Sequence, residues 1–255
     1  MKYIDVHCHV EDFDESLLDN IFASGIDKII CAGADLNTSV KCMRLAESRP
    51  QVYFTAGLHP TEVLKSGEDD LKEIEKLASH EKCVAIGEIG LDYHYPDTDK
   101  QAQKTAFLKQ LEIAGKLGLP VQIHSRDCAE DTYEILKEAC PLKAGGLLHC
   151  YSYSVEMLKE FEKLGLYFSF GGTSTYRHSK KPRRCAASVS IDKILTETDS
   201  PYLPPSSKFG TFPNTPESII EIAENIAALR EIGIEEFTLS VWNNAHKLFK
   251  KLNNK

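Results

Sequence analysis

Short apolar segments alternate with longer amphipathic segments from one end of the chain to the other. The longer segments carry apolar residues at spacings of three and four, as at Phe107, Leu111 and Ala114 within residues 101–118, and this pattern predicts helices. Eight short segments have the length and apolar character of buried parallel strands: residues 3–9, 28–33, 52–57, 83–88, 120–124, 145–149, 166–170 and 193–198. A strand followed by a helix eight times in 255 residues is typical of a (β/α)8 or TIM barrel.

We therefore assign the chain to the α/β class and expect one domain over residues 1–255. Residues 235–252 follow the eighth unit with an apolar stripe that includes Phe237 and Val241, which predicts an additional C-terminal helix. The main alternative is an open doubly wound sheet, which would need a glycine-rich phosphate turn after its first strand. The first predicted strand ends instead in the sequence His-Cys-His at residues 7–9, which favours the barrel.

Six residues of the types that bind metal ions lie at the ends of five predicted strands. His7 and His9 are two residues apart, so alternation along a strand places both imidazoles on one face. The other strand ends add two more imidazoles and two carboxylates: Glu88, His124, His149 and Asp199. The carboxyl ends of barrel strands meet at one rim, where active sites are built. Because six ligands exceed the needs of one tetrahedral zinc, we expect two divalent cations, Mg²⁺, Mn²⁺ or Zn²⁺, with a bridging carboxylate.

Net charge and cysteine content limit the partners and the compartment. The formal charge is −8, so binding to nucleic acid would need a local basic patch or bound metal. Eight cysteines occur without a Cys-x-x-Cys pair, and no apolar run reaches the roughly 20 residues that cross a bilayer. We read the thiols as reduced and expect a cytoplasmic protein without membrane association. Cys8 and Cys150, each beside a histidine, are expected to point away from the barrel axis.

Two segments near the predicted rim differ from the rest of the chain. Residues 177–184 hold five Lys or Arg, and we expect Lys180, Lys181, Arg183 and Arg184 to bind the substrate backbone from a loop after the seventh strand. A solvated charged loop is the alternative. Residues 200–216 contain five of the eleven prolines and follow the eighth strand, so they form a stiff connection on the same face.

The motifs together resemble the TatD family of metal-dependent deoxyribonucleases, within the amidohydrolase-like barrels. The resemblance runs nearly end to end and rests on residues 4–9 (IDVHCH), 57–60 (GLHP), 87–93 (GEIGLDY), 122–127 (QIHSRD), 149–152 (HCYS), 197–203 (ETDSPYL) and 244–249 (NAHKLF). It implies that His7, His9 and Asp199 bind one metal, that His124 and His149 bind a second, and that Glu88 bridges them. It also implies hydrolysis of phosphodiester bonds in DNA, mainly as an exonuclease acting at single-stranded ends, with no obligate protein partner.

Two departures from the family pattern concern substrate contacts. Thr61 stands where the family often has a second histidine after His-Pro. The sequence Asn-Thr-Pro at 214–216 is kept, but an Arg-Gly pair that often precedes it is replaced by Lys-Phe-Gly-Thr at 208–211.

The positions of several residues near the predicted rim indicate further roles in the site. A divalent cation lowers the pKa of bound water, so a metal-bound hydroxide would be the nucleophile, and Asp199 could bind metal and accept the proton. Asp5 is expected to support a ligand or to be structural, and Asp92 to orient a ligand or cap the next segment. Arg126 offers a guanidinium to phosphate, with a rim salt bridge as the alternative, and His59 is expected to contact substrate.

Other functions remain open at this point. A carbamylated lysine bridges the metals in other amidohydrolases, and the presence of Glu88 argues against that class. The same metal pair could hydrolyse another ester, such as a misacylated transfer RNA or another phosphoester. A non-catalytic metal or nucleic-acid binder would not need all six ligands.

Overall fold

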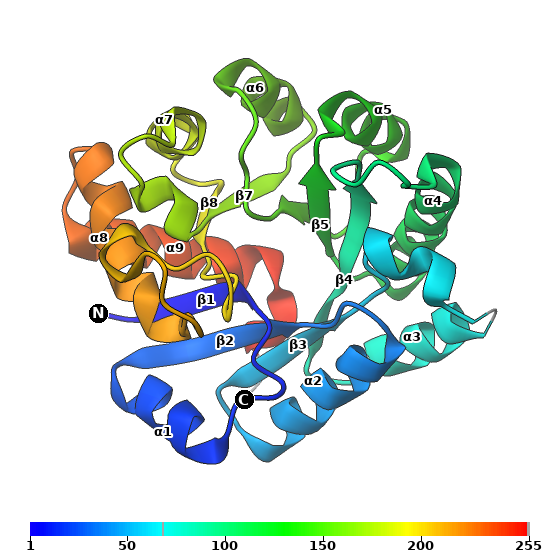
Figure 1. The fold of residues 1–255 in the computed structure, drawn as a ribbon, viewed down its shortest axis with the longest axis horizontal. Helices are drawn as coiled ribbons and strands as arrows, with labels where there is room; N and C mark the ends of the chain where they lie inside the picture. The colour runs from blue at the N-terminus through cyan, green and yellow to red at the C-terminus, as the bar shows by residue number, and fades with distance from the viewer. Residues whose placement is uncertain (68, 254–255) are drawn as a thin grey trace.

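Eight parallel strands surround the centre of the molecule in chain order, and the helices lie outside them (Figure 1). The computed structural model describes residues 1–67 and 69–253. The strands are β1 (Tyr3–Cys8), β2 (Ile26–Ala32), β3 (Val52–Ala56), β4 (Cys83–Asp92), β5 (Val121–Arg126), β6 (Gly146–Leu148), β7 (Tyr167–Phe170) and β8 (Ile194–Thr196). The predicted (β/α)8 barrel is confirmed.

At least one helix follows every strand. The α-helices are α1 (Glu15–Ala23), α2 (Leu36–Ser48), α3 (Asp70–Ala78), α4 (Lys100–Leu117), α5 (Ala129–Ala139), α6 (Val155–Lys163), α7 (Lys180–Ser188), α8 (Ile219–Leu229) and α9 (Ile234–Leu248). Short 3-10 helices add η1 (Pro60–Lys65), η2 (Gly172–Thr175), η3 (Ser206–Lys208), η4 (Pro216–Ser218) and η5 (Lys250–Asn253). Over the described residues, no helix is long and apolar enough to cross a membrane.

The strand bounds differ from the predicted ones mainly at β4. This strand continues to Asp92, four residues beyond the predicted end at Glu88, because it stays paired with β5 until Asp92 lies opposite Arg126. Glu88 is therefore inside the strand, and Asp92 is the last residue of the strand. Both residues are buried.

Two backbone hydrogen bonds join the end of β1 and the residue that follows it to the segment after β8, at the carboxyl rim. The Asp199 amide donates to the His7 carbonyl at 3.0 Å, and the His9 amide donates to the Ser200 carbonyl at 2.6 Å. These two bonds bring residues from opposite ends of the sequence together at the rim where the predicted ligands lie.

The C-terminal region contains the additional helix that the sequence predicts, with one difference. Residues 235–252 are not one helix, because α9 ends at Leu248 and η5 follows it. The predicted stripe is buried, including Phe237, Val241 and Leu252. Asn244 in α9 donates to the carbonyls of Ile191 and Ile194, at the start of β8.

Candidate metal centre

All six predicted metal ligands lie close together at the carboxyl rim of the barrel. His7, Glu88 and His124 lie on β1, β4 and β5, whereas His9, His149 and Asp199 lie just beyond the ends of β1, β6 and β8. The barrel therefore collects at one place side chains that are up to 192 residues apart in the sequence.

Four ligand atoms form the first group. The Nε2 atoms of His7 and His9 are 3.2 Å apart, and each lies 3.5 Å from Asp199 Oδ1. Glu88 Oε2 lies 3.5 Å from His7 Nε2 and 3.6 Å from His9 Nε2. A tetrahedral cation with ligand bonds of about 2.0–2.2 Å holds its ligand atoms about 3.3–3.6 Å apart. His7, His9 and Asp199 therefore offer three ligand atoms for one divalent cation, and Glu88 Oε2 lies near enough to both imidazoles to contribute a fourth.

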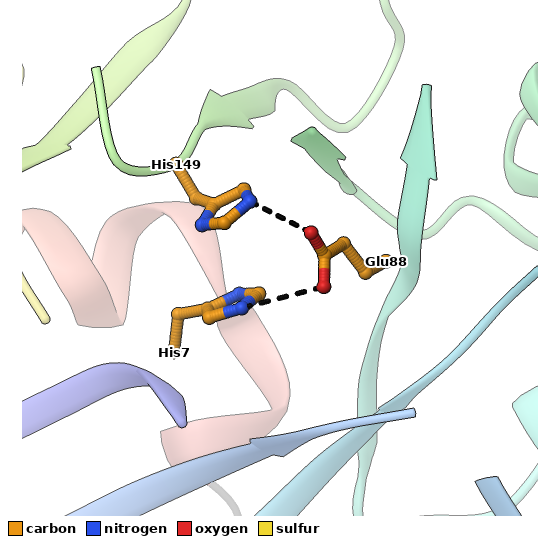
Figure 2. Close-up of side chains that lie close together, drawn as sticks. All are labelled: His7, Glu88 and His149. Carbon is orange, nitrogen blue, oxygen red and sulfur yellow. Dashed lines mark ion pairs between the residues drawn. The ribbon is translucent and has the colours of Figure 1, made fainter. Parts of the chain in front are cut away.

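Three ligand atoms form a second group around the other oxygen of Glu88. Glu88 Oε1 lies 2.8 Å from His124 Nδ1 and 2.8 Å from His149 Nε2, and these two nitrogens are 3.2 Å apart. Figure 2 shows the Glu88 carboxylate between His149 and His7, with one oxygen directed at each imidazole. This arrangement places Glu88 where a carboxylate bridging two cations would lie.

The ionisation of the carboxylates and imidazoles in the two groups favours the binding of cations. Glu88 is buried, which disfavours its ionised form, but His149 and its other histidine neighbours hold the pKa of its carboxyl well below the usual range. The pKa of Asp199 is also lowered, because His9 and His7 outweigh the effect of burial. The Asp199 and Glu88 carboxylates overcome burial and raise the pKa of His9 to about 10. Two buried ionised carboxylates among imidazoles fit divalent cations, which would replace the protons on these rings.

A hydrogen-bond acceptor holds the outer nitrogen of three of the four histidines. Gln122 Oε1 lies 2.8 Å from His7 Nδ1, and the Ala32 carbonyl lies 3.0 Å from His9 Nδ1. Asp92 Oδ2 lies 3.1 Å from His124 Nε2. Such partners fix the ring orientation and the tautomer, and leave the inner nitrogen to bind metal. Asp92 Oδ1 also accepts from the His94 amide at 2.9 Å, so its contacts fit both expected roles, orienting a ligand and capping the next segment.

The fourth histidine faces a buried carboxylate. Glu197 Oε1 lies 3.7 Å from His149 Nδ1, and within the described residues neither atom has a hydrogen-bond partner. The other oxygen of Glu197 accepts from Ser169 Oγ at 2.5 Å. Glu197 is therefore the carboxylate that faces the outer nitrogen of His149, at a separation longer than a direct hydrogen bond.

Asp5 supports the rim through hydrogen bonds to the chain around His7 and Thr198. Its Oδ1 accepts from the amides of His7 at 3.2 Å and Thr198 at 3.0 Å, and its Oδ2 accepts from Thr198 Oγ1 at 2.5 Å. Asp5 therefore links the chain at His7 to the residue before Asp199. These bonds position the backbone of the ligands and leave the ligand side chains to other partners.

Sequence reasoning missed Gln122 and Glu197. Both residues lie two positions before a predicted ligand, His124 or Asp199, and so share its face of the barrel. Asp5 has the same relation to His7. A polar residue two positions before a rim ligand was thus an available signal for this supporting role.

The expectation that Cys150 points away from the site is wrong. Cys150 lines the cavity beside His149, whereas Cys8 is buried with its thiol toward the Ile30 carbonyl, as expected. Strand alternation stops at Leu148, and Cys150 has a positive φ of 46°, so the backbone turns its side chain back toward the rim.

A cavity of about 500 Å³ opens beside the second group. Arg126 lines it together with Asp199 and Tyr202. His59 does not line this cavity; its Nε2 lies 3.5 Å from Glu88 Oε1, and burial lowers the pKa of its imidazole to about 4. Thr61, at the position of the family's second histidine, contacts His59 Nδ1 through its hydroxyl at 2.8 Å.

The basic segment is not the loop that the sequence predicted, because α7 begins at Lys180. Lys180, Lys181 and Arg184 are exposed, but Arg183 is partly buried and donates to the Ser174 carbonyl at 3.3 Å. Pro182 of the same helix lines the cavity. The helix therefore lies at the edge of the cavity, and Arg183 holds it against η2.

Comparison with known proteins gives matches over nearly the whole chain. The family described as TatD related DNase matches residues 4–250. An uncharacterized metal-dependent hydrolase of Bacillus subtilis, YabD, is 37% identical over 251 residues, which cover 96% of this chain and 98% of that protein. A second such hydrolase, YcfH of Escherichia coli, is 34% identical over 98% of this chain and 96% of its own. The crystal structure of the TatD homolog YjjV from Escherichia coli superposes with a TM-score of 0.92 at 30% identity, covering 97% of this chain and 98% of that one.

Proposed function

The chain belongs to the TatD family of metal-dependent hydrolases, and we propose that it is a deoxyribonuclease that hydrolyses phosphodiester bonds at single-stranded DNA ends. One observation carries the proposal: the two oxygens of Glu88 face two separate groups of ligand atoms beside an open cavity. Paired divalent sites are typical of enzymes that cleave phosphodiesters by in-line displacement.

The residues around the cavity suit an anionic diester. Cations held by the two groups would neutralise the phosphate and activate water. Asp199 directs Oδ1 at His7 and His9, and we assign to its carboxylate the role of accepting a proton from the attacking water. Arg126, on the cavity wall, would bind a phosphate oxygen with its guanidinium.

For His59 we keep the substrate contact that the sequence predicts. Its Nε2 faces the bridging carboxylate, and its low pKa keeps the ring neutral at physiological pH. A neutral imidazole can donate one hydrogen bond to a phosphate oxygen beside Glu88 without adding a charge to the site.

We also propose the cytoplasm as the compartment. All eight cysteines are free thiols, five of which have less than 1% of their surface exposed, and thiols persist in reducing compartments.

A substrate panel on metal-depleted protein tests the proposed function. Single-stranded DNA, duplex DNA, RNA, a phosphomonoester and a misacylated transfer RNA would each be tested with added Mg²⁺, Mn²⁺ or Zn²⁺. We expect fastest hydrolysis of single-stranded DNA with a divalent cation, and loss of activity on chelation. Preference for the aminoacyl ester would replace the nuclease assignment with that of a deacylase. Full activity after chelation, with metal absence verified by elemental analysis, would exclude the metal mechanism.

A further inference from the structure

Three aromatic side chains project into solvent from the proline-rich segment that follows β8. The exposed fractions are 56% for Tyr202 and 72% for each of Phe209 and Phe212. Large apolar side chains gathered on one surface mark interaction sites more often than chance exposure does. Figure 1 shows this segment, coloured yellow to gold, passing over the carboxyl rim between β8 and α8.

The segment that carries these rings is held firmly. Buried Asn214 donates through Nδ2 to the carbonyls of Thr198 and Tyr202 at 3.2 and 2.8 Å, and its Oδ1 accepts from Ser218 Oγ at 2.7 Å. The backbone N–H of Asn214 also donates to the Pro201 carbonyl at 2.9 Å. Exposed rings on an anchored backbone lose little conformational entropy when they bind a ligand.

The rings extend outward from the metal centre. The Tyr202 ring centroid is 6.3 Å from that of His9 and 6.4 Å from that of Phe212. Tyr176, which follows η2, lies 5.6 Å from Phe209 and donates its hydroxyl to the Pro204 carbonyl at 2.6 Å. We call Tyr176, Tyr202, Phe209 and Phe212 the aromatic platform.

The two segments that carry the platform are themselves basic, although Glu221 of α8 accepts hydrogen bonds from Ser207 in one of them. Residues 176–189 and 200–216 contain no Asp or Glu but six Lys or Arg, in a chain of net charge −8: Arg177, Lys180, Lys181, Arg183, Arg184 and Lys208. The rim segments after β4 and β5 have the opposite character, with Asp97, Asp99, Asp127, Glu130 and Asp131. An anionic ligand would therefore approach the metal centre from the side of the platform.

We propose that the aromatic platform binds the bases of a single nucleic-acid strand next to the phosphodiester at the metal centre. The inference rests on the proposed nuclease function and deepens it, because it assigns the side from which the strand enters. Aromatic rings interleaved with basic residues are the surface that single strands bind, with bases stacked on rings and phosphates near cations. A protein or membrane partner would account for the exposed rings, but not for the continuity of Tyr202 with the cavity.

The proposal has a consequence for specificity. Every base offers a π face, so stacking tolerates any sequence, and duplex ends would bind only after their bases unpair. We therefore expect binding that depends on the presence of bases and little on their identity.

Binding by fluorescence anisotropy tests the platform. The protein would carry Asp199→Asn to prevent turnover, would be loaded with metal, and would bind a short oligothymidylate or an abasic oligonucleotide of equal length and charge. We expect Phe209→Ala and Phe212→Ala each to weaken oligothymidylate binding by about 5- to 140-fold, the range for loss of one stacked base. Affinity for the abasic strand should stay within twofold. Leu239→Ala, which removes a side chain 60% exposed on α9, is the control and should leave both affinities unchanged.

The outcomes separate the platform from the nuclease assignment. Equal affinity of the parent protein for the two strands, or equal weakening of both by the variants, would overturn the platform. If base-dependent binding is lost in the variants but wild-type protein cleaves no DNA, the platform stands and the nuclease function falls. If wild-type protein cleaves DNA but the parent protein binds abasic strands as tightly as oligothymidylate, the nuclease function stands and the platform falls. Sedimentation with anionic phospholipid vesicles that is abolished by Phe209→Ala, without base-dependent binding, would assign the rings to a membrane.

Discussion

Replacing Asp92 by asparagine should weaken one of the two cation sites and leave the other intact. Asp92 is buried, and its two carboxylate oxygens have different partners. Oδ2 lies 3.1 Å from His124 Nε2, and Oδ1 accepts from the His94 amide at 2.9 Å. An asparagine amide has only one acceptor oxygen, so its NH₂ group must face one of these two donors. His124 would then either lose its acceptor or keep only a neutral amide oxygen, which is a weaker acceptor than a carboxylate.

The size of the effect follows from that hydrogen bond. A hydrogen bond to a charged group contributes about 1.5–3 kcal/mol, which corresponds to about 10- to 140-fold in an affinity. Loss of a residue that supports a metal-bound histidine costs about 10- to 100-fold. We expect Asp92→Asn to weaken the site of His124, His149 and Glu88 Oε1 within this range. The site of His7, His9 and Asp199 should keep its affinity, because Gln122 and the Ala32 carbonyl orient its two imidazoles.

Titration of metal-depleted protein with Zn²⁺ or Mn²⁺, in competition with a chelating dye, would resolve the two binding steps. Asp127→Asn is the control, because it removes the same charge from an exposed carboxylate that contacts His94 Nδ1 at 3.2 Å. Thermal unfolding without metal would show that both variants are folded. Two unchanged binding steps in Asp92→Asn, or equal weakening of both, would refute the orienting role.

Asp199→Asn should lower turnover about 10²- to 10⁴-fold at full metal occupancy, because the amide cannot accept a proton; wild-type turnover with metal verified would remove Asp199 as the base. Neutralising Lys180, Lys181 and Arg184 should raise the KM for single-stranded DNA and reduce the slope of log affinity against log salt by about 0.7 for each phosphate that no longer has a cationic partner. An unchanged slope would assign these side chains to solvent. Phe168→Ala should lower the free energy of unfolding by about 3–5 kcal/mol in urea titration, because the ring is fully buried on β7. A decrease of less than about 1 kcal/mol in the free energy of unfolding would show that neighbouring side chains fill the space left by the ring.

Local pattern alone was enough to predict the barrel and the position of the candidate site. Alternating apolar and amphipathic segments specify strands and helices, and eight such units leave few ways to bury every strand on both faces. Once the strands are parallel, their carboxyl ends must share a rim. Residues such as Glu88 and His124 could therefore be expected to meet, although 35 residues separate them in the sequence.

The conformation of the backbone at the rim could not be predicted from the local sequence pattern. Continued pairing with β5 extends β4 to Asp92, and the positive φ of Cys150 turns a thiol that alternation would have pointed away. Both features depend on a neighbouring strand or on a turn conformation, and neither leaves a periodic signal in the sequence. The start of α7 at Lys180, where a loop was expected, is of the same kind.

The sequence by itself determined which residues could bind metal, because residue type and strand position are local properties. Only the tertiary structure decided which oxygen of Glu88 faces which imidazoles, and that Gln122 and Glu197 stand behind His7 and His149. It also placed the exposed rings of residues 200–216 beside the basic helix α7. These relations join atoms from different strands and loops, and their distances depend on how the whole barrel closes.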